Sequence, residues 1–456
     1  MTAKEKWQLF FTDCDNRFRK KHKTIPADGR NPFENDYGRL ISSAPIRRLQ
    51  DKTQVIPLGE SDFTRTRLTH SMEVSYIASS IGQSIEKELI EKGDISLEQK
   101  GYLSSLLRVA GLVHDLGNPP FGHFGEEAIR AFFSDYFKAN PQMAKRLNEK
   151  EQADFTNFDG NVQTFRILTK LYYFGDEFGY NLSYPTLASI IKYPFDSLTG
   201  MQKSEKHKFG YFVTEEDRYS VINEKLQLNH KRFPLVYLLE AADDIAYSAA
   251  DIEDGVKERI ITIDDVEDIF NQELKTNTTA VLGLLKTLEH TFGKHSSLGQ
   301  SLIVQKFRID CQRIMIQGVI NSFFEHYEEI MNGDLDKELI MVSSGADVRT
   351  AYKKLQAKIF NSKSIQIKEL GGWQSIQGLL NIYVKASESD DFKLTGNTFE
   401  GRLYRIMSSS HREIYERVEK YQNSTNNKLR LIVDFIAGMT DRYAVNLYQE
   451  LKGIKL

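Results

Sequence analysis

The sequence predicts an all-α fold with at most small β-hairpins. Two observations support this prediction: several long stretches repeat apolar residues with the period of an α-helix, and the runs that resemble strands are short. The chain has 456 residues but only ten prolines, so few positions would interrupt a long helix. Length alone allows two or three domains. No stretch has the composition of a linker, however, and we expect one large helical domain over residues 1–456.

Four stretches carry the helical pattern. The first is 69–87, with apolar residues at 74, 77, 78 and 81, and the second is 102–114, with apolar residues at 103, 106, 107, 110 and 113. The third is 233–250, with apolar residues at 236, 239, 246 and 250, and the fourth is 427–451, which Gly438 divides. Each pattern places one apolar face toward a core.

Other stretches predict strands or loops. The strand-like runs are TQVIPL (53–58) and FGYFVT (209–214). Polar composition predicts loops at 31–38, 141–157, 199–208 and 292–300. We see no internal repeat and no low-complexity tract.

Composition excludes several classes of protein. The net charge of -3 and the pI near 6.4 give no global argument for binding nucleic acid or membrane. The basic run Arg17–Lys23 is interpreted as a solvated start of the chain. Two cysteines, Cys14 and Cys311, exclude a disulfide scaffold and a cysteine-based zinc site, and they fit a reducing cytoplasm. We therefore expect a cytoplasmic protein with no signal peptide and no membrane span.

Ionisable residues lie on the apolar faces of the predicted helices. His114 ends the apolar face of 102–114, His70 begins that of 69–87, and Asp243 lies on that of 233–250. A buried carboxylate without a partner is costly. Asp115 and Asp243 together with the two histidines therefore suggest a shared divalent cation. Each residue alone is more often a hydrogen-bonded core histidine, a helix cap or a member of an ion pair.

A second group of ionisable residues follows the end of the predicted helix 102–114. Gly117 and two prolines stop the helix, and the loop FGHFG (121–125) presents His123. Glu126 lies three residues further on, where we expect a new helix to start. A carboxylate that orients an imidazole is the usual form of an acid–base pair. The alternative is a helix N-terminus with favourable acidic residues.

Three stretches resemble the H…HD…D pattern of the HD-domain metal phosphohydrolases: RTRLTHSMEV, VHDLGNPPFGHFGEE and EAADDIAYSAADIEDG. Within that family they resemble the deoxyguanosine triphosphate triphosphohydrolases, to which HDLGNPPFGHFGE is specific. Four further stretches support the resemblance: RRLQDKTQV (47–55), FDGNVQTFRIL (158–168), IIKYPF (191–196) and AGMTDRYA (437–444). The resemblance extends from about residue 30 to about residue 445. It implies an HD core over roughly 60–255 and a C-terminal helical elaboration over 256–456.

The resemblance also implies a set of site residues. One divalent metal ion per subunit, Mg²⁺ or Mn²⁺, would be held by His70, His114, Asp115 and Asp243. Asp243 is chosen over Asp244 because the family shows the spacing Asp-x-x-x-Tyr-x-x-x-Asp from its metal ligand. His123 and Glu126 would form the catalytic pair. The implied substrate-binding residues are Gln50, Arg67, Asn118, Lys192, Tyr193, Lys208, Tyr247 and Asp251.

Several of these residues have more specific implied contacts. Arg67 would hold phosphate, Lys192 and Tyr193 would lie near the triphosphate, and Lys208 is a weaker phosphate candidate. Tyr247 would pack by the sugar and Gln50 would touch the base. Ile46 and Val162 depart from the family pattern, which usually has an aromatic residue and an alanine there. Both departures are interpreted as packing changes.

The implied reaction converts dGTP, or other dNTPs, to a deoxynucleoside and inorganic triphosphate by attack of water at the α-phosphorus. Two alternatives stay open: a 5′-deoxynucleotidase or phosphodiesterase of the HD type, and a non-catalytic dNTP sensor. The resemblance further implies a homo-oligomer, a tetramer or a hexamer. Some members of the family respond to a dNTP activator or to single-stranded DNA at a separate site. Residues 256–380 carry helical patterns without a chemical motif.

Overall fold

The computed structural model describes residues 1–12, 17–19, 29–59, 65–173, 175–203, 208–276, 278–419 and 424–454. Throughout these ranges the ordered elements are helices, so the all-α prediction is confirmed. The only paired extended residues within them form an isolated antiparallel bridge between Thr53 and Thr66. The strand-like runs 53–58 and 209–214 are turns and irregular chain. Neither run finds a partner strand, and a lone strand leaves its backbone groups without partners.

The α-helices as far as residue 257 are α1 (Ala3–Thr12), α2 (Pro32–Ile41), α3 (Ala44–Arg48), α4 (Arg67–Lys92), α5 (Tyr102–Val113), α6 (Gly122–Ala139), α7 (Pro141–Ala144), α8 (Glu149–Thr156), α9 (Gly160–Arg166), α10 (Tyr184–Ala188), α11 (Ser197–Lys203), α12 (Glu216–Lys225) and α13 (Pro234–Lys257). Short 3₁₀ turns are η1 (Leu49–Asp51), η2 (Leu97–Gln99) and η4 (Val213–Glu215), and η3 (Ile167–Leu171) is a π-helical turn.

The remaining α-helices are α14 (Ile263–Glu273), α15 (Thr278–Phe292), α16 (Ser297–Glu325), α17 (Tyr327–Asn332), α18 (Ala346–Phe360), α19 (Lys363–Ser387), α20 (Phe399–Ile406), α21 (Ser409–Ile414), α22 (Ser424–Ala437) and α23 (Asp441–Leu451). A 3₁₀ turn η5 (Leu339–Val342) and a π-helical turn η6 (Tyr415–Glu419) complete them.

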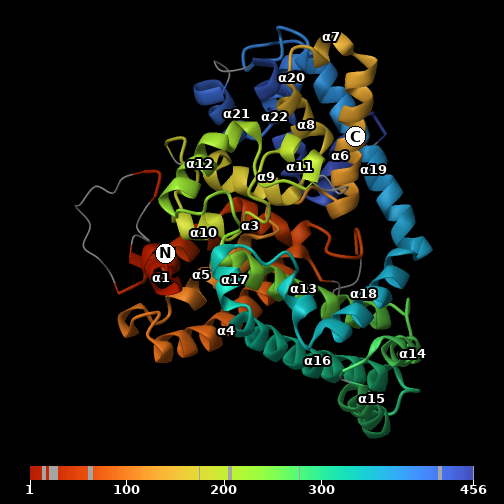
Figure 1. Cartoon of the computed structure of the whole chain (residues 1–456). Coiled ribbons are helices and arrows are strands. Elements are labelled where there is room, and N and C mark those ends of the chain that lie inside the picture. Colours follow the sequence, from red (N-terminus) through yellow and green to blue (C-terminus); the bar gives the residue numbers. More distant parts are fainter. Residues whose placement is uncertain are drawn as a thin grey trace.

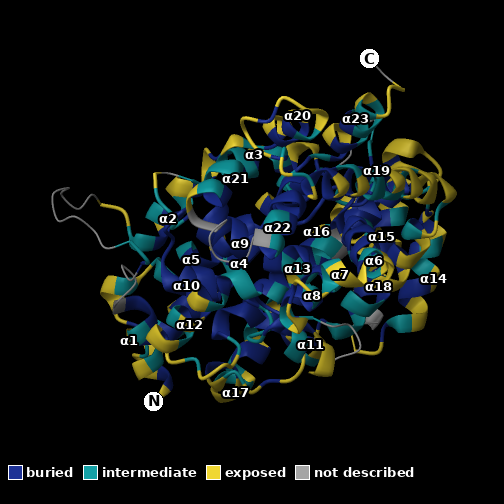
Figure 2. Ribbon diagram, turned by 90° about the horizontal axis from the view of Figure 1, so that it is seen from above, coloured by how far each residue is buried: buried dark blue, intermediate teal, exposed yellow. Residues whose placement is uncertain are grey.

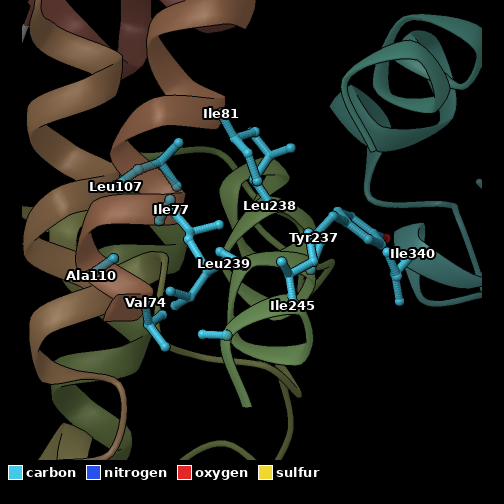
Figure 3. Packing of buried hydrophobic residues seen from close by; sticks show 14 of the residues in the cluster. Val74, Ile77, Ile81, Leu107, Ala110, Tyr237, Leu238, Leu239, Ile245 and Ile340 are labelled. Atoms are coloured by element: carbon cyan, nitrogen blue, oxygen red, sulfur yellow. The ribbon is translucent and has the colours of Figure 1, made fainter. Parts of the chain in front are cut away.

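One hydrophobic core is built around α4, α5 and α13, which the sequence predicted as three helical stretches. Figure 3 shows Val74 and Ile77 of α4 packed toward Leu239 of α13, and Ile81 of α4 beside Leu238. The helix α4 starts at a capping box of Thr66 and ends at Gly93, whose φ of 77° is left-handed. The long helix α16 covers the outer side of α13. These helices form the lower part of Figure 1.

A second hydrophobic core lies around α6, α19, α22 and α23 in the upper part of Figure 1. The long helix α19 contacts α6 as well as both C-terminal helices. The predicted break near Gly438 is confirmed, because α22 ends at Ala437 and Thr440 caps α23. Figure 2 shows buried residues through the middle of the molecule and exposed residues at its periphery. A single domain over the whole chain stays a prediction.

The prediction of loops at polar stretches was largely wrong. The stretch 31–38 lies mostly in α2, which Asn31 caps and which buries Phe33, Asp36 and Leu40. The stretch 141–157 contains α7 and α8, and part of 199–208 belongs to α11. The stretch 292–300 does hold a break, between α15 and α16. Buried polar residues such as Asp36 form hydrogen bonds with partners distant in sequence. Composition alone does not identify those partners.

Two sequence features lie wholly or mostly outside the described residues. They are Cys14 and the basic run Arg17–Lys23, of which only residues 17–19 are described. Among the described residues, no helix combines the length and the apolar character that crossing a membrane requires.

Candidate metal centre and acid–base pair

Three of the four predicted metal ligands lie where α4 and α5 meet. His70 is in the first turn after the N-terminus of α4, and His114 directly follows α5, with Asp115 next to it. One ligand atom from each of these three residues lies within 4.8 Å of the others. His70 and His114 are almost fully buried, and the Asp115 carboxylate is 14% exposed. The site is therefore at the end of the first hydrophobic core and opens to one side.

The hydrogen bonds of His114 leave one ring nitrogen available as a ligand. Its Nδ1 lies 2.8 Å from the carbonyl oxygen of Gly111, which can only accept, so Nδ1 donates. The lone pair of the neutral ring is then on Nε2. This nitrogen is buried and has no hydrogen-bond partner among the described residues. A backbone carbonyl that fixes the ring in this way is the usual support of a metal-binding histidine.

Asp243 of α13 supplies the second carboxylate. Its Oδ1 lies 3.1 Å from Nε2 of His70 and 3.3 Å from Nε2 of His114. The neighbouring Asp244 pairs instead with Arg349, at 3.2 Å. The helix thus directs Asp243, and not Asp244, toward the two imidazoles. Two imidazole nitrogens and two carboxylates form a donor set that suits a divalent ion.

The charges around Asp115 favour its ionised form. Burial by itself raises the pKa of Asp115, but the charges of His114 and Arg67 outweigh burial and hold the pKa below its ordinary value. The Arg67 guanidinium lies 2.5 Å from Asp115 Oδ2. Burial lowers the pKa of His114, and the carboxylates of Asp115 and Asp243 more than reverse the effect. Burial also raises the pKa of Asp243, but His114 and His70 hold it well below its ordinary value. Both carboxylates thus remain charged, as cation binding requires.

His123 and Glu126 face the same space from α6. This helix begins at Gly122 and not near Glu126, so the prediction that a loop presents His123 was wrong. Phe121 turns the chain with a left-handed φ of 63° directly before the helix. Both residues therefore belong to the first turns of α6, three positions apart on one face. A pattern of apolar residues marks the body of a helix better than its first turn.

The His123–Glu126 contact has the geometry of an acid–base pair. His123 Nδ1 lies 3.1 Å from Glu126 Oε2, and the other carboxylate oxygen, Oε1, accepts from the backbone N–H of Gly160 at 2.7 Å. Glu126 is buried, whereas the His123 side chain is 78% exposed. The hydrogen bond and the charge of Glu126 raise the pKa of His123. The carboxylate thus holds an imidazole that is open to a ligand.

A cavity of about 420 Å³ joins the two groups. Eight of the predicted residues line it: Arg67, His70, Asp115, Asn118, His123, Lys192, Asp243 and Tyr247. Lys192 Nζ lies 4.0 Å from Asp243 Oδ2. Asn118 also donates to Asp115 Oδ1 at 2.7 Å, so it supports a candidate ligand as well as lining the cavity. The cavity holds cationic, imidazole and aromatic groups close together.

Four predicted substrate residues do not line this cavity. Gln50 lines an adjacent cavity of about 140 Å³, and Tyr193 packs against the ring of Phe195. The other two are engaged within the protein: Lys208 pairs with Asp159 at 2.5 Å, and the buried Asp251 accepts from Gln356 at 2.8 Å. Substrate contacts of Gln50, Tyr193, Lys208 and Asp251 stay predictions.

The cavity also has a wall that the sequence did not predict. Lys353 and Phe360 of α18 and Glu369 of α19 line it, as do Gln54 and Asn161. The spacing of Lys353 and Phe360, seven residues apart, signals only that they share a helix face. Their approach to the cavity depends on the packing of α18 against α13. Part of the segment 256–380, which carried no motif, thus completes the candidate site.

Comparison with known proteins identifies the family of the chain. The model of the HD domain matches residues 67–218, and the model of the phosphohydrolase-associated domain matches residues 399–450. The chain is 37% identical to a deoxyguanosinetriphosphate triphosphohydrolase-like protein of Listeria monocytogenes, over 98% of this chain and 100% of that protein. It is 30% identical to a protein of the same description from Synechocystis, over 94% of this chain and 95% of that protein.

A third relative carries the enzyme's name without the qualification. The chain is 31% identical to a deoxyguanosinetriphosphate triphosphohydrolase of Yersinia pestis, over 92% of this chain and 93% of that protein. HD domains bind divalent metals, and the cluster of His70, His114 and Asp115 is compatible with such an ion. The chain therefore belongs to the deoxyguanosinetriphosphate triphosphohydrolase family of HD-domain phosphohydrolases, and it is a hydrolase.

Proposed function

We propose that this protein hydrolyses dGTP, or other dNTPs, to the deoxynucleoside and inorganic triphosphate, by attack of water at the α-phosphorus. One observation carries the proposal. A cavity of about 420 Å³ has a buried set of imidazoles and carboxylates on one side and the His123–Glu126 pair on the other. The names of the relatives support this choice of substrate and product.

His70, His114, Asp115 and Asp243 would hold one divalent ion, Mg²⁺ or Mn²⁺. When bound, such an ion lowers the pKa of water and offsets charge on a phosphoryl group. Arg67 and Lys192 would neutralise further phosphate charge from the cavity wall. Phosphoryl transfer depends chiefly on such positioning and electrostatics.

The chain's own proton carrier would be His123. Held by Glu126 through Nδ1, the ring presents Nε2 to the cavity. It would exchange a proton either with the attacking water or with the departing 5′-oxygen. Tyr247, whose ring lies 6.0 Å from that of His70, would pack against the deoxyribose. A homo-oligomer, a dNTP activator or single-stranded DNA at a separate site, and a cytoplasmic location stay predictions from the family resemblance.

The test is the identity of the product. The protein is incubated with each dNTP, alone and mixed, with Mn²⁺ or Mg²⁺, and the products are separated by chromatography. We expect deoxynucleoside and triphosphate, and a loss of more than about 100-fold in rate for Asp243→Ala, because support residues alone are worth 10–100-fold. Asp135→Ala, an 85% exposed carboxylate on α6, is the control. Cleavage of monophosphates only would favour a nucleotidase, and tight dGTP binding without turnover would favour a sensor.

A further inference from the structure

Asp441, the first residue of α23, connects the C-terminal helices to the segment before the acid–base pair. Its side chain is buried, and its Oδ1 accepts from the backbone N–H of Phe121 at 3.0 Å. Its Oδ2 accepts from the backbone N–H of Thr53 at 2.9 Å and from the Thr53 hydroxyl. One carboxylate thus joins two backbone segments that are far apart in sequence. Phe121 immediately precedes the helix turn that carries His123.

The Thr53 segment leads to the candidate metal centre. The carbonyl oxygen of Thr53 accepts from Arg67 Nε at 3.2 Å, and that of Lys52 accepts from the backbone N–H of Arg67 at 3.0 Å. Arg67 in turn pairs with Asp115. Thr53 and Arg67 therefore connect Asp441 to Asp115 by hydrogen bonds.

Lys52 makes a second connection between the same parts. Its buried ammonium group donates to the carbonyl oxygens of Asn118, at 2.6 Å, and Ala437, at 2.8 Å. Ala437 ends α22, and Asn118 donates its side-chain N–H to Asp115. Lys52 thus ties the end of α22 to the segment between Asp115 and His123.

We propose that Lys52 and Asp441 are positioning residues, through which α22 and α23 hold Asp115 and His123 in the geometry that hydrolysis requires. This inference rests on the proposed function. The two residues and their hydrogen-bond partners are called the Lys52–Asp441 clamp below. The clamp gives a physical role to two of the stretches that carried the resemblance, RRLQDKTQV and AGMTDRYA.

Burying the charged groups of Lys52 and Asp441 costs free energy. Burial lowers the pKa of Lys52 to about 7, and burial raises the pKa of Asp441. An apolar pair of similar volume would fill the same space without that penalty. What an apolar pair would lack is the directed hydrogen bonds to Phe121, Thr53 and Asn118. A site that must be held to a fraction of an ångström needs such directed support.

The experiment compares clamp variants with a matched control. Asp441→Ala removes both connections of the carboxylate, and Asp441→Asn keeps one acceptor, because its amide group donates on the other side. Lys52→Met removes the two hydrogen bonds of the ammonium group. Tyr404→Phe is the control: it removes a hydrogen bond of 2.6 Å to Glu416 in the same C-terminal part of the chain.

Two readouts are measured for each variant: kcat and KM for triphosphate release with Mn²⁺, and amide hydrogen exchange of peptides covering residues 116–125. We expect kcat to fall about 10- to 100-fold in Asp441→Ala and Lys52→Met, with a smaller loss in Asp441→Asn. KM should stay within about threefold, because neither Lys52 nor Asp441 lines the cavity and the phosphate-binding cations Arg67 and Lys192 are both retained. Exchange in 116–125 should rise in the clamp variants and not in Tyr404→Phe.

Folded clamp variants that keep the wild-type kcat would overturn the proposal, as would a lost rate with unchanged exchange in 116–125. If Asp441→Ala does not fold, Lys52→Met and Thr53→Val decide between the same outcomes. A wild-type chain that releases no triphosphate refutes the proposed function instead. In that case the exchange comparison alone still decides whether the clamp holds the 116–125 segment.

Discussion

Replacing Glu126 with glutamine should invert the tautomer of His123. The backbone N–H of Gly160, 2.7 Å from Oε1, can only donate, so it keeps the amide oxygen of the new side chain on its side. The amide NH₂ group then faces His123 Nδ1, where Oε2 accepted at 3.1 Å. Nδ1 must now accept, and the ring proton moves to Nε2. A proton acceptor that faces the cavity through Nε2 has then lost its lone pair there. A proton donor is also impaired, because the amide NH₂ group disfavours the imidazolium, which carries a proton on Nδ1 as well.

The size of the effect follows from this change of tautomer. Loss of a positioned acid or base costs about 10²–10⁴-fold, and a carboxylate-to-amide change behind a catalytic histidine lies at the upper end of that range. We expect kcat of Glu126→Gln to fall by about 10²–10⁴-fold. The unfolding free energy should change by no more than about 1 kcal/mol, because the amide keeps the shape and the Gly160 hydrogen bond.

The pH profile gives an independent prediction. The hydrogen bond to Glu126 is the largest cause that raises the pKa of His123, and the charge of Glu126 is the second. Without the carboxylate, the pKa falls toward its ordinary value, so the pH at which the residual rate changes moves to lower pH. A wild-type rate that declines as pH rises through this pKa identifies His123 as proton donor. A rate that declines as pH falls identifies it as proton acceptor.

The assay is triphosphate release from dGTP at saturating Mn²⁺ between pH 5.5 and 9. Asp135→Asn makes the same chemical change at an exposed position of α6 and should leave the profile unaltered. A Glu126→Gln rate within about twofold of wild type would refute the acid–base pair. So would a rate reduced at every pH with no displacement of the profile.

Three further predictions concern other parts of the molecule. A Cβ on Gly160 would overlap Asn118 Oδ1 and lie 2.8 Å from Glu126 Oε1, so Gly160→Ala should lower kcat at least about 10-fold in steady-state assays. Lys192→Met should raise KM for dGTP about 10-fold or more and weaken its dependence on salt, because a phosphate-binding charge is lost from the cavity. Burial lowers the pKa of His411 from 6.5 to about 4. Between these two pH values the unfolded chain therefore binds more protons than the folded chain. The wild type should lose up to about 3 kcal/mol of unfolding free energy on going from pH 6.5 to pH 4, and urea titrations should show a correspondingly smaller loss for His411→Gln.

Sequence reasoning succeeded where the information is local. The apolar period of 69–87 and 102–114 identified α4 and α5, since a helix buries every third or fourth side chain whatever its partner. The same period showed that His70 and His114 point inward. It also failed locally: α2 and α8 were predicted as loops because their composition is polar. The prediction was wrong because capping boxes and distant partners satisfy those polar residues.

The sequence by itself determined the all-α fold and its main helices, and it suggested that His70, His114, Asp115 and Asp243 share a cation. These features depend on the spacing of residues within one helix or one turn. Only the tertiary structure decided that Lys353 and Phe360 complete the cavity, and that Lys52 reaches both Asn118 and Ala437. Such contacts join segments that lie 66 residues apart in one case and 385 in the other. They are set by how whole helices pack, which no local pattern contains.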